Sequence, residues 1–318
     1  MIVSTTDEII DRHQEQVQSA LGFEITTYPH IDAIPEEVAS RVEILITYGN
    51  DLTDENVLRF RKLKWIQMLS AGLEDLPFEQ LVKQDVMVTN AKGIHPIPMS
   101  EYVIGGMLHF EKHFDRYMNM QNNQEWDREI LVGELNDRKV LIYGTGAIGV
   151  KIAEKAKCFD MVVHGVNTSG RPVEPFDHVL TLEEAEEHVN EYSYVVCVLP
   201  LTDHTAGIFN QEYLEKLNEN AVFINVGRGG LVDEDALVEV LNNEQIYGAV
   251  LDVFQTEPLP KGHPLWEAKN TIITPHMSAK SYRYLERCMN IFIDNYTKYK
   301  ENMPADEMVN IVDLHRHY

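Results

Sequence analysis

The chain has 318 residues, of which 44% are hydrophobic, so it is long enough to form about two domains with their own cores. Its formal net charge of −24 argues against non-specific binding to nucleic acid or to an anionic membrane face. This acidity does not exclude a small anionic substrate, because local charges govern a pocket.

The beginning of the chain lacks the apolar run of a signal peptide, since Asp7 and Glu8 follow the first six residues directly. The longest apolar runs, such as 194–201, are far shorter than the ~20 residues that a membrane helix needs. The three cysteines are odd in number and widely spaced, which does not suggest a disulfide framework. We expect a cytoplasmic protein with no membrane or nucleic-acid partner.

Residues 1 to about 97 alternate short apolar strands with helical patterns, which predicts a parallel sheet covered by helices. Two prolines, Pro96 and Pro98, then interrupt the pattern and indicate a crossing between domains. A helix is expected to resume over 99–113. The expected strands are 2–4, 23–27, 44–47, 65–69 and 86–89, and the expected helical stretches include 7–20 and 54–62.

A glycine-rich stretch over 139–149 opens the second part of the chain and reads as strand, tight turn and helix. In a G-x-G-x-x-G fingerprint, the first glycine (Gly144) permits the turn and the second (Gly146) lets the backbone approach a pyrophosphate. The third (Gly149) lets the helix pack close to its strand. The free N–H groups of the helix N-terminus favour the anion. We therefore predict a dinucleotide cofactor here.

The rest of the second part has the rhythm of a doubly wound sheet. A long helical pattern over 280–301 follows, and we expect it to return to the first domain. The predicted fold is α/β, with two Rossmann-like or flavodoxin-like domains on parallel sheets and a cleft between them. We expect residues 1–97 plus 284–318 to bind substrate and residues 98–283 to bind the dinucleotide. Six strands are expected in the second part, at 140–144, 161–166, 194–199, 221–226, 247–253 and 271–274.

The loop after the second strand of the fingerprint unit bears on the choice of cofactor. An NAD-preferring site usually has Asp or Glu about twenty residues after the fingerprint, on the ribose hydroxyls. Here Asn167, Thr168, Ser169 and Arg171 stand in that region instead. A carboxylate repels a 2′-phosphate, whereas these groups can bind one. The loop favours NADP(H), and NAD(H) is the alternative.

Three later segments each end a strand with a chemically useful residue. Arg228 lies between glycines, and its planar fork can hold a carboxylate through two bonds and polarise a carbonyl. Glu257 and His276 follow the next two strands, and a carboxylate beside an imidazole fixes the ring. Each residue alone is ordinary on a surface. Because parallel strands end at one sheet edge, their joint placement predicts an acid/base site.

The order of these motifs makes a resemblance specific. Over nearly its whole length, the chain resembles the D-isomer-specific 2-hydroxyacid dehydrogenase family. Its length, Met-Ser-Glu-Tyr at 99–102 and Pro-His-Met-Ser-Ala at 275–279 are similar to the glyoxylate/hydroxypyruvate reductase branch, which commonly uses NADPH. The matching motifs are Ser-Ala-Gly-Leu at 70–73, the fingerprint, Leu-Pro-Leu-Thr at 199–202, Asn-Val-Gly-Arg-Gly at 225–229, Leu-Asp-Val-Phe at 251–254, Glu-Pro at 257–258 and Pro-His at 275–276.

The resemblance implies a role for each matching residue in reducing a small 2-keto acid to a D-2-hydroxy acid. His276 would be the general acid that protonates the keto oxygen as hydride arrives, and Glu257 would hold it protonated. Arg228 would bind the carboxylate and carbonyl oxygen of the substrate. Asp252 would meet the nicotinamide carboxamide. The implied substrate-binding residues are Ala71, Gly72, Leu73 and Tyr48. The implied cofactor-binding residues are Gly144, Thr145, Gly146, Ala147, Ile148, Gly149, Asn167, Thr168, Ser169, Arg171, Leu199, Pro200, Thr205, Val226, Gly227, Arg228, Asp252, His276 and Ser278.

The resemblance further suggests a homodimer that contacts through the cofactor domain, with residues 111–135 as an arm. Two alternatives stay open. A formate dehydrogenase relative would carry Gln where Glu257 stands, whereas an NAD(H)-sensing binding protein without metabolic turnover can retain the same Arg, Glu and His. His109 and His113 lie four residues apart on a predicted helix, as two metal ligands would. No third ligand lies near them in sequence, so no metal is predicted.

Overall fold

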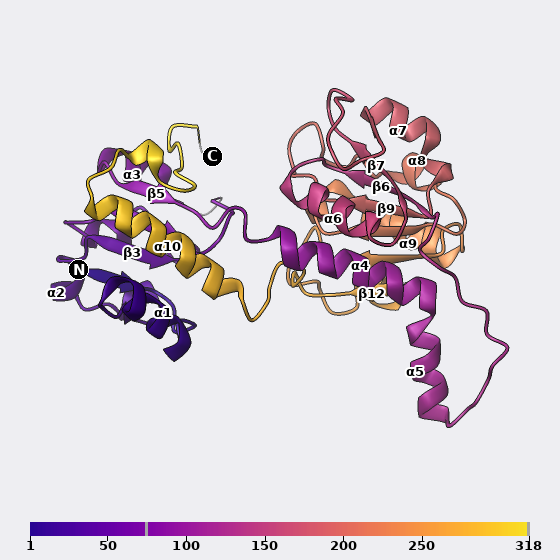
Figure 1. Cartoon of the computed structure of the whole chain (residues 1–318), viewed down its shortest axis with the longest axis horizontal. Coiled ribbons are helices and arrows are strands. Elements are labelled where there is room, and N and C mark those ends of the chain that lie inside the picture. The colour runs from indigo at the N-terminus through magenta and orange to yellow at the C-terminus, as the bar shows by residue number, and fades with distance from the viewer. Residues whose placement is uncertain (74–75, 317–318) are drawn as a thin grey trace. The chain divides into compact units, whose positions relative to one another are not determined.

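The computed structural model describes residues 1–73 and 76–316. The chain divides into two compact units, Met1–Ile94 with Ser281–Tyr318 and His95–Lys280, which are drawn in Figure 1. The boundaries expected from sequence lie a few residues further along the chain. Within the described residues, no helix has both the length and the apolar composition needed to cross a bilayer.

The first unit is built on a five-stranded sheet in the order β2-β1-β3-β4-β5, with every neighbouring pair parallel. This is the flavodoxin-like order. The prediction of a helix over 54–62 is wrong, because only a four-residue 3₁₀ turn forms at Asn56–Arg59. The strands are β1 Ile2–Ser4, β2 Thr26–Thr27, β3 Ile44–Thr47, β4 Trp65–Met68 and β5 Met87–Thr89, and the helices are α1 Asp11–Leu21, α2 Glu36–Ala39, α3 Phe78–Lys83 and α10 Tyr284–Lys300.

The C-terminal helix α10 completes the core of the first unit. Its buried face includes Phe292, whose ring stacks on Trp65 of β4 with centroids 5.5 Å apart. Beyond the helix, Ile311 forms an antiparallel bridge with Thr89 at the end of β5. A segment from the far end of the sequence therefore covers one face of the N-terminal sheet (Figure 1).

The second unit is built on a seven-stranded parallel sheet in the order β12-β11-β10-β9-β6-β7-β8. Read from β8, this is the Rossmann order with one further strand, and the order reverses between β6 and β9. The sequence predicted six strands and missed the short edge strand β8. The strands are β6 Lys139–Tyr143, β7 Val162–Val166, β8 His178–Leu180, β9 Tyr194–Cys197, β10 Val222–Asn225, β11 Gly248–Leu251 and β12 Thr271–Ile273.

Helices cover both faces of this sheet, which gives the second unit two hydrophobic cores. One core includes residues of α4 and α6, and the other includes residues of α7 to α9. Both faces of each central strand are therefore buried. A ligand is expected to bind at the carboxyl edge of the sheet. The helices are α4 Pro96–Lys112, α5 Phe114–Asn123, α6 Ala147–Lys157, α7 Leu182–His188, α8 Gln211–Leu214 and α9 Glu234–Asn242.

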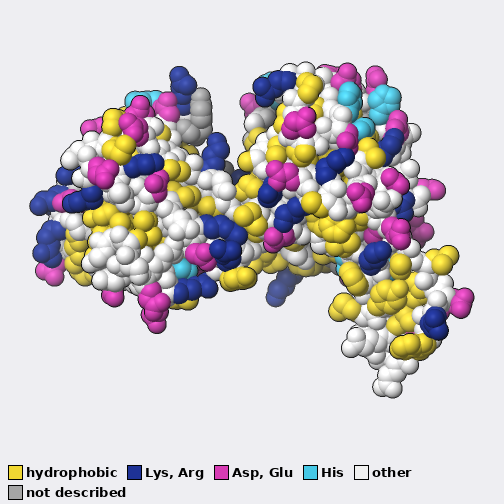
Figure 2. Space-filling view, in the orientation of Figure 1, with side chains coloured by type: hydrophobic (Ala, Val, Ile, Leu, Met, Phe, Trp, Pro, Cys, Tyr) yellow, Lys and Arg dark blue, Asp and Glu magenta, His cyan; other side chains and the backbone are white. Residues whose placement is uncertain are grey.

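Helix α5 and the chain that follows it project from the body of the second unit (Figure 1). The helix buries no residue, and the segment exposes large apolar side chains. Trp126 and Leu131 are each 90% exposed. Figure 2 shows hydrophobic side chains gathered on this projecting segment. We call residues 114–132 the arm.

Candidate active site

The glycine fingerprint forms a tight turn between β6 and α6. Gly144 has φ of +112°, a left-handed conformation that favours glycine. Gly146 is the N-cap of α6, and a Cβ there would have open space around it. A Cβ on Gly149 would lie 1.8 Å from the carbonyl oxygen of Gly144, so only glycine lets the helix approach the turn. These features fit a cradle for a pyrophosphate at a helix N-terminus.

The two glycines of α6 should therefore respond differently to substitution by alanine. Gly149→Ala is expected to lower the free energy of unfolding by about 1–3 kcal/mol, because a methyl group is forced against a backbone carbonyl. Gly146→Ala should leave thermal stability close to the parent but weaken dinucleotide binding, because its methyl group would occupy the approach to the turn. Thermal melts with and without cofactor measure both effects. Equal melting temperatures for the two apo variants would contradict this account.

The loop after β7 is organised around the side chain of Asn167. Its amide nitrogen donates to Thr145 Oγ1 (3.1 Å) and to the carbonyl oxygen of Arg171 (3.0 Å), and its Oδ1 accepts from the Ser169 amide (3.1 Å). Thr168, Ser169 and Arg171 are exposed. Asn167 thus connects the glycine turn to the loop, and leaves the other polar groups at the surface.

The residues beyond β9 and β10 shape the adjoining part of the edge. Thr205 Oγ1 donates to the carbonyl oxygen of Pro200 (2.7 Å), so this hydroxyl closes the loop that begins at Leu199. The amide of Val226 donates to the carbonyl oxygen of Cys197 (3.0 Å) and continues the sheet ladder. The resemblance implies that Leu199, Pro200 and Thr205 contact the cofactor, and the structure places them on one loop at the carboxyl end of β9.

Arg228 extends from a backbone that its neighbours fix. Asn225 accepts from the Gly227 amide (3.0 Å) through its side-chain oxygen and donates to the Arg228 carbonyl oxygen (3.1 Å). A Cβ on Gly229 would lie 1.9 Å from the carbonyl carbon of Phe254, so the loops after β10 and β11 are in close backbone contact. The exposed Arg228 side chain therefore stands on a rigid base.

His276 and Glu257 form a direct pair. Nδ1 of His276 lies 2.8 Å from Glu257 Oε2, and Glu257 Oε1 accepts from the Phe254 amide (3.0 Å). His276 has φ of +54°, and its side chain is 50% exposed. With Nδ1 bound to the carboxylate, Nε2 is the ring nitrogen that can face a ligand.

Asp252 holds the segment that carries His276. Its side chain is fully buried, and its oxygens accept from the amides of Met277 (2.7 Å) and Ser278 (2.8 Å) and from the Thr274 hydroxyl. The Asp252 carbonyl oxygen accepts from the His276 amide (2.8 Å). These contacts let Asp252 position the His276 segment; the contact with nicotinamide that the resemblance implies stays a prediction. Ser278 is also buried.

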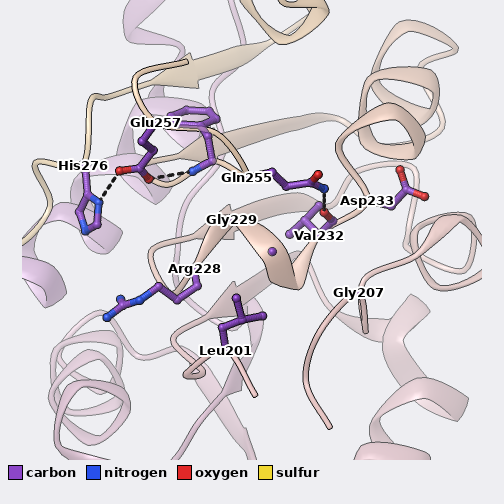
Figure 3. Close-up of a pocket in the computed structure, with 11 residues that line it drawn as sticks. Leu201, Gly207, Arg228, Gly229, Val232, Asp233, Gln255, Glu257 and His276 are labelled. Atoms are coloured by element: carbon purple, nitrogen blue, oxygen red, sulfur yellow. Dashed lines mark hydrogen bonds and ion pairs between the residues drawn. The ribbon is translucent and has the colours of Figure 1, made fainter. Parts of the chain in front are cut away.

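A pocket of about 770 Å³ joins the three candidate catalytic residues. Figure 3 shows Arg228 and His276 extending toward the same side, with Glu257 behind the imidazole. The rest of the wall comes from glycines and side chains of neighbouring loops, including Leu201 and Gln255. Three side chains from consecutive strand ends thus converge on one cavity, as the sequence predicted.

The substrate-binding candidates of the first unit lie after β3 and β4. Ser70 Oγ lies 3.2 Å from the carbonyl oxygen of Tyr48 and 3.0 Å from that of Gly72, and Asn90 donates to the Ala71 carbonyl oxygen (3.2 Å). These bonds shape a turn over 70–72. Leu73 is buried in the core of this unit.

Sequence reasoning missed His95, at the N-cap of α4. Burial lowers its pKa, and the nearby positive charge of Arg228 lowers it further, so the neutral imidazole is favoured. The sequence offered one signal that could have pointed to His95, which is its position between Ile94 and Pro96, where the chain crosses from one unit to the other. No spacing rule connects that position to Arg228.

The remaining candidates do not line this pocket. His113 ends α4 in a left-handed conformation and lies 3.2 Å from the Tyr247 hydroxyl, whereas His109 faces Asp115 at 3.9 Å. Over residues 1–73 and 76–316, no group of three or more His, Cys, Asp or Glu side chains is arranged to hold a metal ion. Cys197 is buried in β9, and burial raises the pKa of its thiol to about 12.

Comparison with known proteins decides the family. Residues 104–278 match the model of the D-isomer specific 2-hydroxyacid dehydrogenase, NAD binding domain. The chain belongs to the D-isomer specific 2-hydroxyacid dehydrogenase family. Members of this family are oxidoreductases, and the matched residues form the NAD-binding domain. The resemblance seen in the sequence is therefore confirmed, as is the α/β fold with two parallel sheets.

Proteins similar to this dehydrogenase include glyoxylate/hydroxypyruvate reductases. It is 30% identical to glyoxylate/hydroxypyruvate reductase A of Citrobacter koseri over 70% of this chain and 73% of that protein. Its fold matches the crystal structure of a D-isomer specific 2-hydroxyacid dehydrogenase family protein from Aeromonas salmonicida, with TM-score 0.84, 32% identity and 98% of each chain covered. An NADPH-dependent glyoxylate/hydroxypyruvate reductase from Sinorhizobium meliloti, solved with NADP and sulfate, gives TM-score 0.76 at 25% identity, covering 100% and 99%.

The match to another group of relatives is partial. The chain is 27% identical over 98% of its length to the D-3-phosphoglycerate dehydrogenase of Methanocaldococcus jannaschii, and spans 60% of that protein. It spans 51% of the enzyme from Bacillus subtilis. The chain therefore spans only part of the length of these phosphoglycerate dehydrogenases.

Proposed function

We propose that this dehydrogenase reduces a small 2-keto acid of the glyoxylate or hydroxypyruvate type to the D-2-hydroxy acid, with NADPH as the favoured cofactor. The observation that carries the proposal is the His276–Glu257 pair, with Nδ1 and Oε2 2.8 Å apart, beside Arg228 in one pocket. A carboxylate-backed imidazole and a guanidinium are suited to a carbonyl oxygen that gains negative charge.

Each residue has a defined part in the proposed reaction. When bound, a reduced nicotinamide would supply the hydride that the keto carbon receives. Nε2 of His276 donates a proton to the oxygen as charge develops there, while Glu257 fixes the ring through Nδ1 and stabilises its positive charge. Arg228 binds the substrate carboxylate and the same carbonyl oxygen. Asp252 keeps the His276 segment in place through the bonds described above.

The first unit would bind the substrate from its own turn over 70–72. Amide groups of Ala71 and Gly72 are proposed to bind the carboxylate, because small residues in a turn allow an anion to approach the backbone. Leu73 supports the turn from the core, and Tyr48 limits the size of the substrate. This proposal rests on the resemblance and on the hydrogen bonds that shape the turn.

The cofactor would occupy the carboxyl edge of the second sheet. The turn at Gly144, Thr145 and Gly146, with Ala147, Ile148 and Gly149 at the start of α6, is proposed to hold the pyrophosphate. The loops at Leu199–Thr205 and Val226–Arg228 would line the rest of the site, with Asp252, His276 and Ser278 beyond them. The loop at 167–171 would bind the 2′-phosphate of NADPH, since it carries a guanidinium and hydroxyls in place of a carboxylate.

Substitution of Arg171 by alanine tests this preference. We expect NADPH to bind roughly tenfold or more weakly, because a charge-assisted contact to phosphate is lost, while NADH binding changes little. Tryptophan-quenching titrations with both cofactors measure the two dissociation constants. Equal losses for NADPH and NADH would remove the proposed 2′-phosphate site.

The direct test of the function is a panel of 2-keto acids assayed with NADPH and with NADH. Glyoxylate, hydroxypyruvate, pyruvate and a branched 2-keto acid cover the range that the family suggests. Turnover of glyoxylate or hydroxypyruvate faster with NADPH supports both parts of the proposal. Cofactor binding without turnover of any acid would favour the alternative of an NAD(H)-sensing binding protein.

We further propose a homodimer in which the arm contacts the partner copy. The apolar side chains of residues 114–132 are exposed in the single chain, and contiguous exposed apolar surface marks interaction sites. Light scattering on a size-exclusion column should give about twice the mass of one chain. A monomer at micromolar concentration would contradict this proposal.

A further inference from the structure

The first unit carries a carboxylate at the sheet edge that holds the proposed substrate-binding turn. Glu8 lies shortly after β1, Tyr48 directly after β3, and residues 70–72 shortly after β4. These three strands are neighbours in one parallel sheet, so the segments that follow them share an edge. Ligands bind at that edge in sheets of this type.

Tyr48 connects Glu8 to the turn. Its hydroxyl donates to Glu8 Oε2 (2.7 Å), and its carbonyl oxygen lies 3.2 Å from Ser70 Oγ. Burial raises the pKa of Tyr48, and the hydrogen bond to Glu8 and its charge raise it further, so the phenol remains a donor. Glu8 is exposed and therefore presents a carboxylate oxygen to solvent beside the phenol.

We propose that Glu8 is a specificity-determining residue that favours 2-keto acids with a neutral or hydrogen-bond-donating substituent at C3 and disfavours those with a second anionic group. This inference rests on the proposed function, because it places the substrate carboxylate at the turn over 70–72. A substrate bound there directs its distal atoms along the edge that Tyr48 and Glu8 share. A hydroxyl group can donate to a carboxylate oxygen, whereas a phosphate is repelled by it.

A negative charge at Glu8 would discriminate between the substrates named for the two kinds of relative that the chain matches. Glyoxylate and hydroxypyruvate carry one negative charge, and a phosphorylated hydroxypyruvate carries a dianion in addition. A like charge at the distal end of the site therefore disfavours the phosphorylated acid by a purely electrostatic mechanism, and salt should weaken this effect.

The test compares kcat/KM for hydroxypyruvate and for 3-phosphohydroxypyruvate in the parent and in Glu8→Gln. Glutamine has the same shape and can still accept from Tyr48, but it has no charge. We expect the ratio of phosphorylated to unphosphorylated substrate to rise roughly tenfold at low ionic strength, and the gain to shrink at high salt. Glu24→Gln is the matched control. It makes the same change in net charge at an exposed residue that precedes β2, at the opposite edge of the sheet.

The outcomes distinguish this inference from the proposed function. If the parent reduces hydroxypyruvate but Glu8→Gln changes the ratio no more than Glu24→Gln, the inference is overturned and the function stands. A parent that reduces no 2-keto acid overturns the function itself. Tyr48→Phe removes the hydrogen bond and keeps the Glu8 charge. An equal rise in the ratio in that variant would assign the effect to positioning of the phenol and overturn the role of the charge.

Discussion

His276→Ala is expected to lower kcat by about 10²–10⁴-fold and to leave cofactor affinity close to that of the parent. The variant removes the imidazole whose Nδ1 is paired with Glu257 and which is the proposed proton donor. It leaves the glycine turn, the 167–171 loop and the bonds from Asp252 to backbone amides in place. Single-turnover reduction of a 2-keto acid and a cofactor titration provide the two measurements.

A matched control for this variant is His188→Ala. The side chain of His188 is 56% exposed and that of His276 is 50% exposed, but His188 lies at the end of α7, outside the pocket. His188→Ala should retain parental kcat. If His276→Ala turns over substrate at the parental rate, the proton donor lies elsewhere and the proposed mechanism is wrong.

Arg228→Gln should lower kcat/KM by roughly 10²–10³-fold, because charge-assisted bonds to the substrate carboxylate and to the developing oxyanion are both lost. Thermal stability should change little, because the side chain is exposed and its backbone is held by Asn225. Arg228→Lys is the informative companion. It retains the charge but not the planar fork, so its kcat/KM should fall between those of the parent and Arg228→Gln.

The result that would contradict this role is a loss of stability with unchanged kinetics. In that case Arg228 would be a structural residue of the loop after β10. Steady-state kinetics with one 2-keto acid, together with a thermal melt, decide between the two outcomes.

Much of the fold was predictable, because buried parallel strands leave strong local patterns. The apolar runs at β3, β4 and β9 are completely buried, and each was expected close to its observed bounds. The convergence of Arg228, Glu257 and His276 also followed from sequence, since parallel strands place their carboxyl ends at one edge. Their catalytic roles stay predictions.

Other features depend on tertiary context, so local patterns were absent or misleading. Strand β8 has only three residues and gains its place by pairing with β7. The 54–62 stretch has a helical pattern but forms only the short turn at Asn56–Arg59. The burial of Asp252, and its bonds to the His276 segment, arise only when strands β11 and β12 are adjacent.

The return of the C-terminal segment to the first sheet has a consequence for biosynthesis. Residues 95–280 are contiguous, so they can complete their own core as soon as they have left the ribosome. The N-terminal sheet emerges earlier, but its Trp65 face stays uncovered until α10 has been translated. The unit made first is therefore finished last, and in the interval we expect its apolar surface to be exposed to solvent.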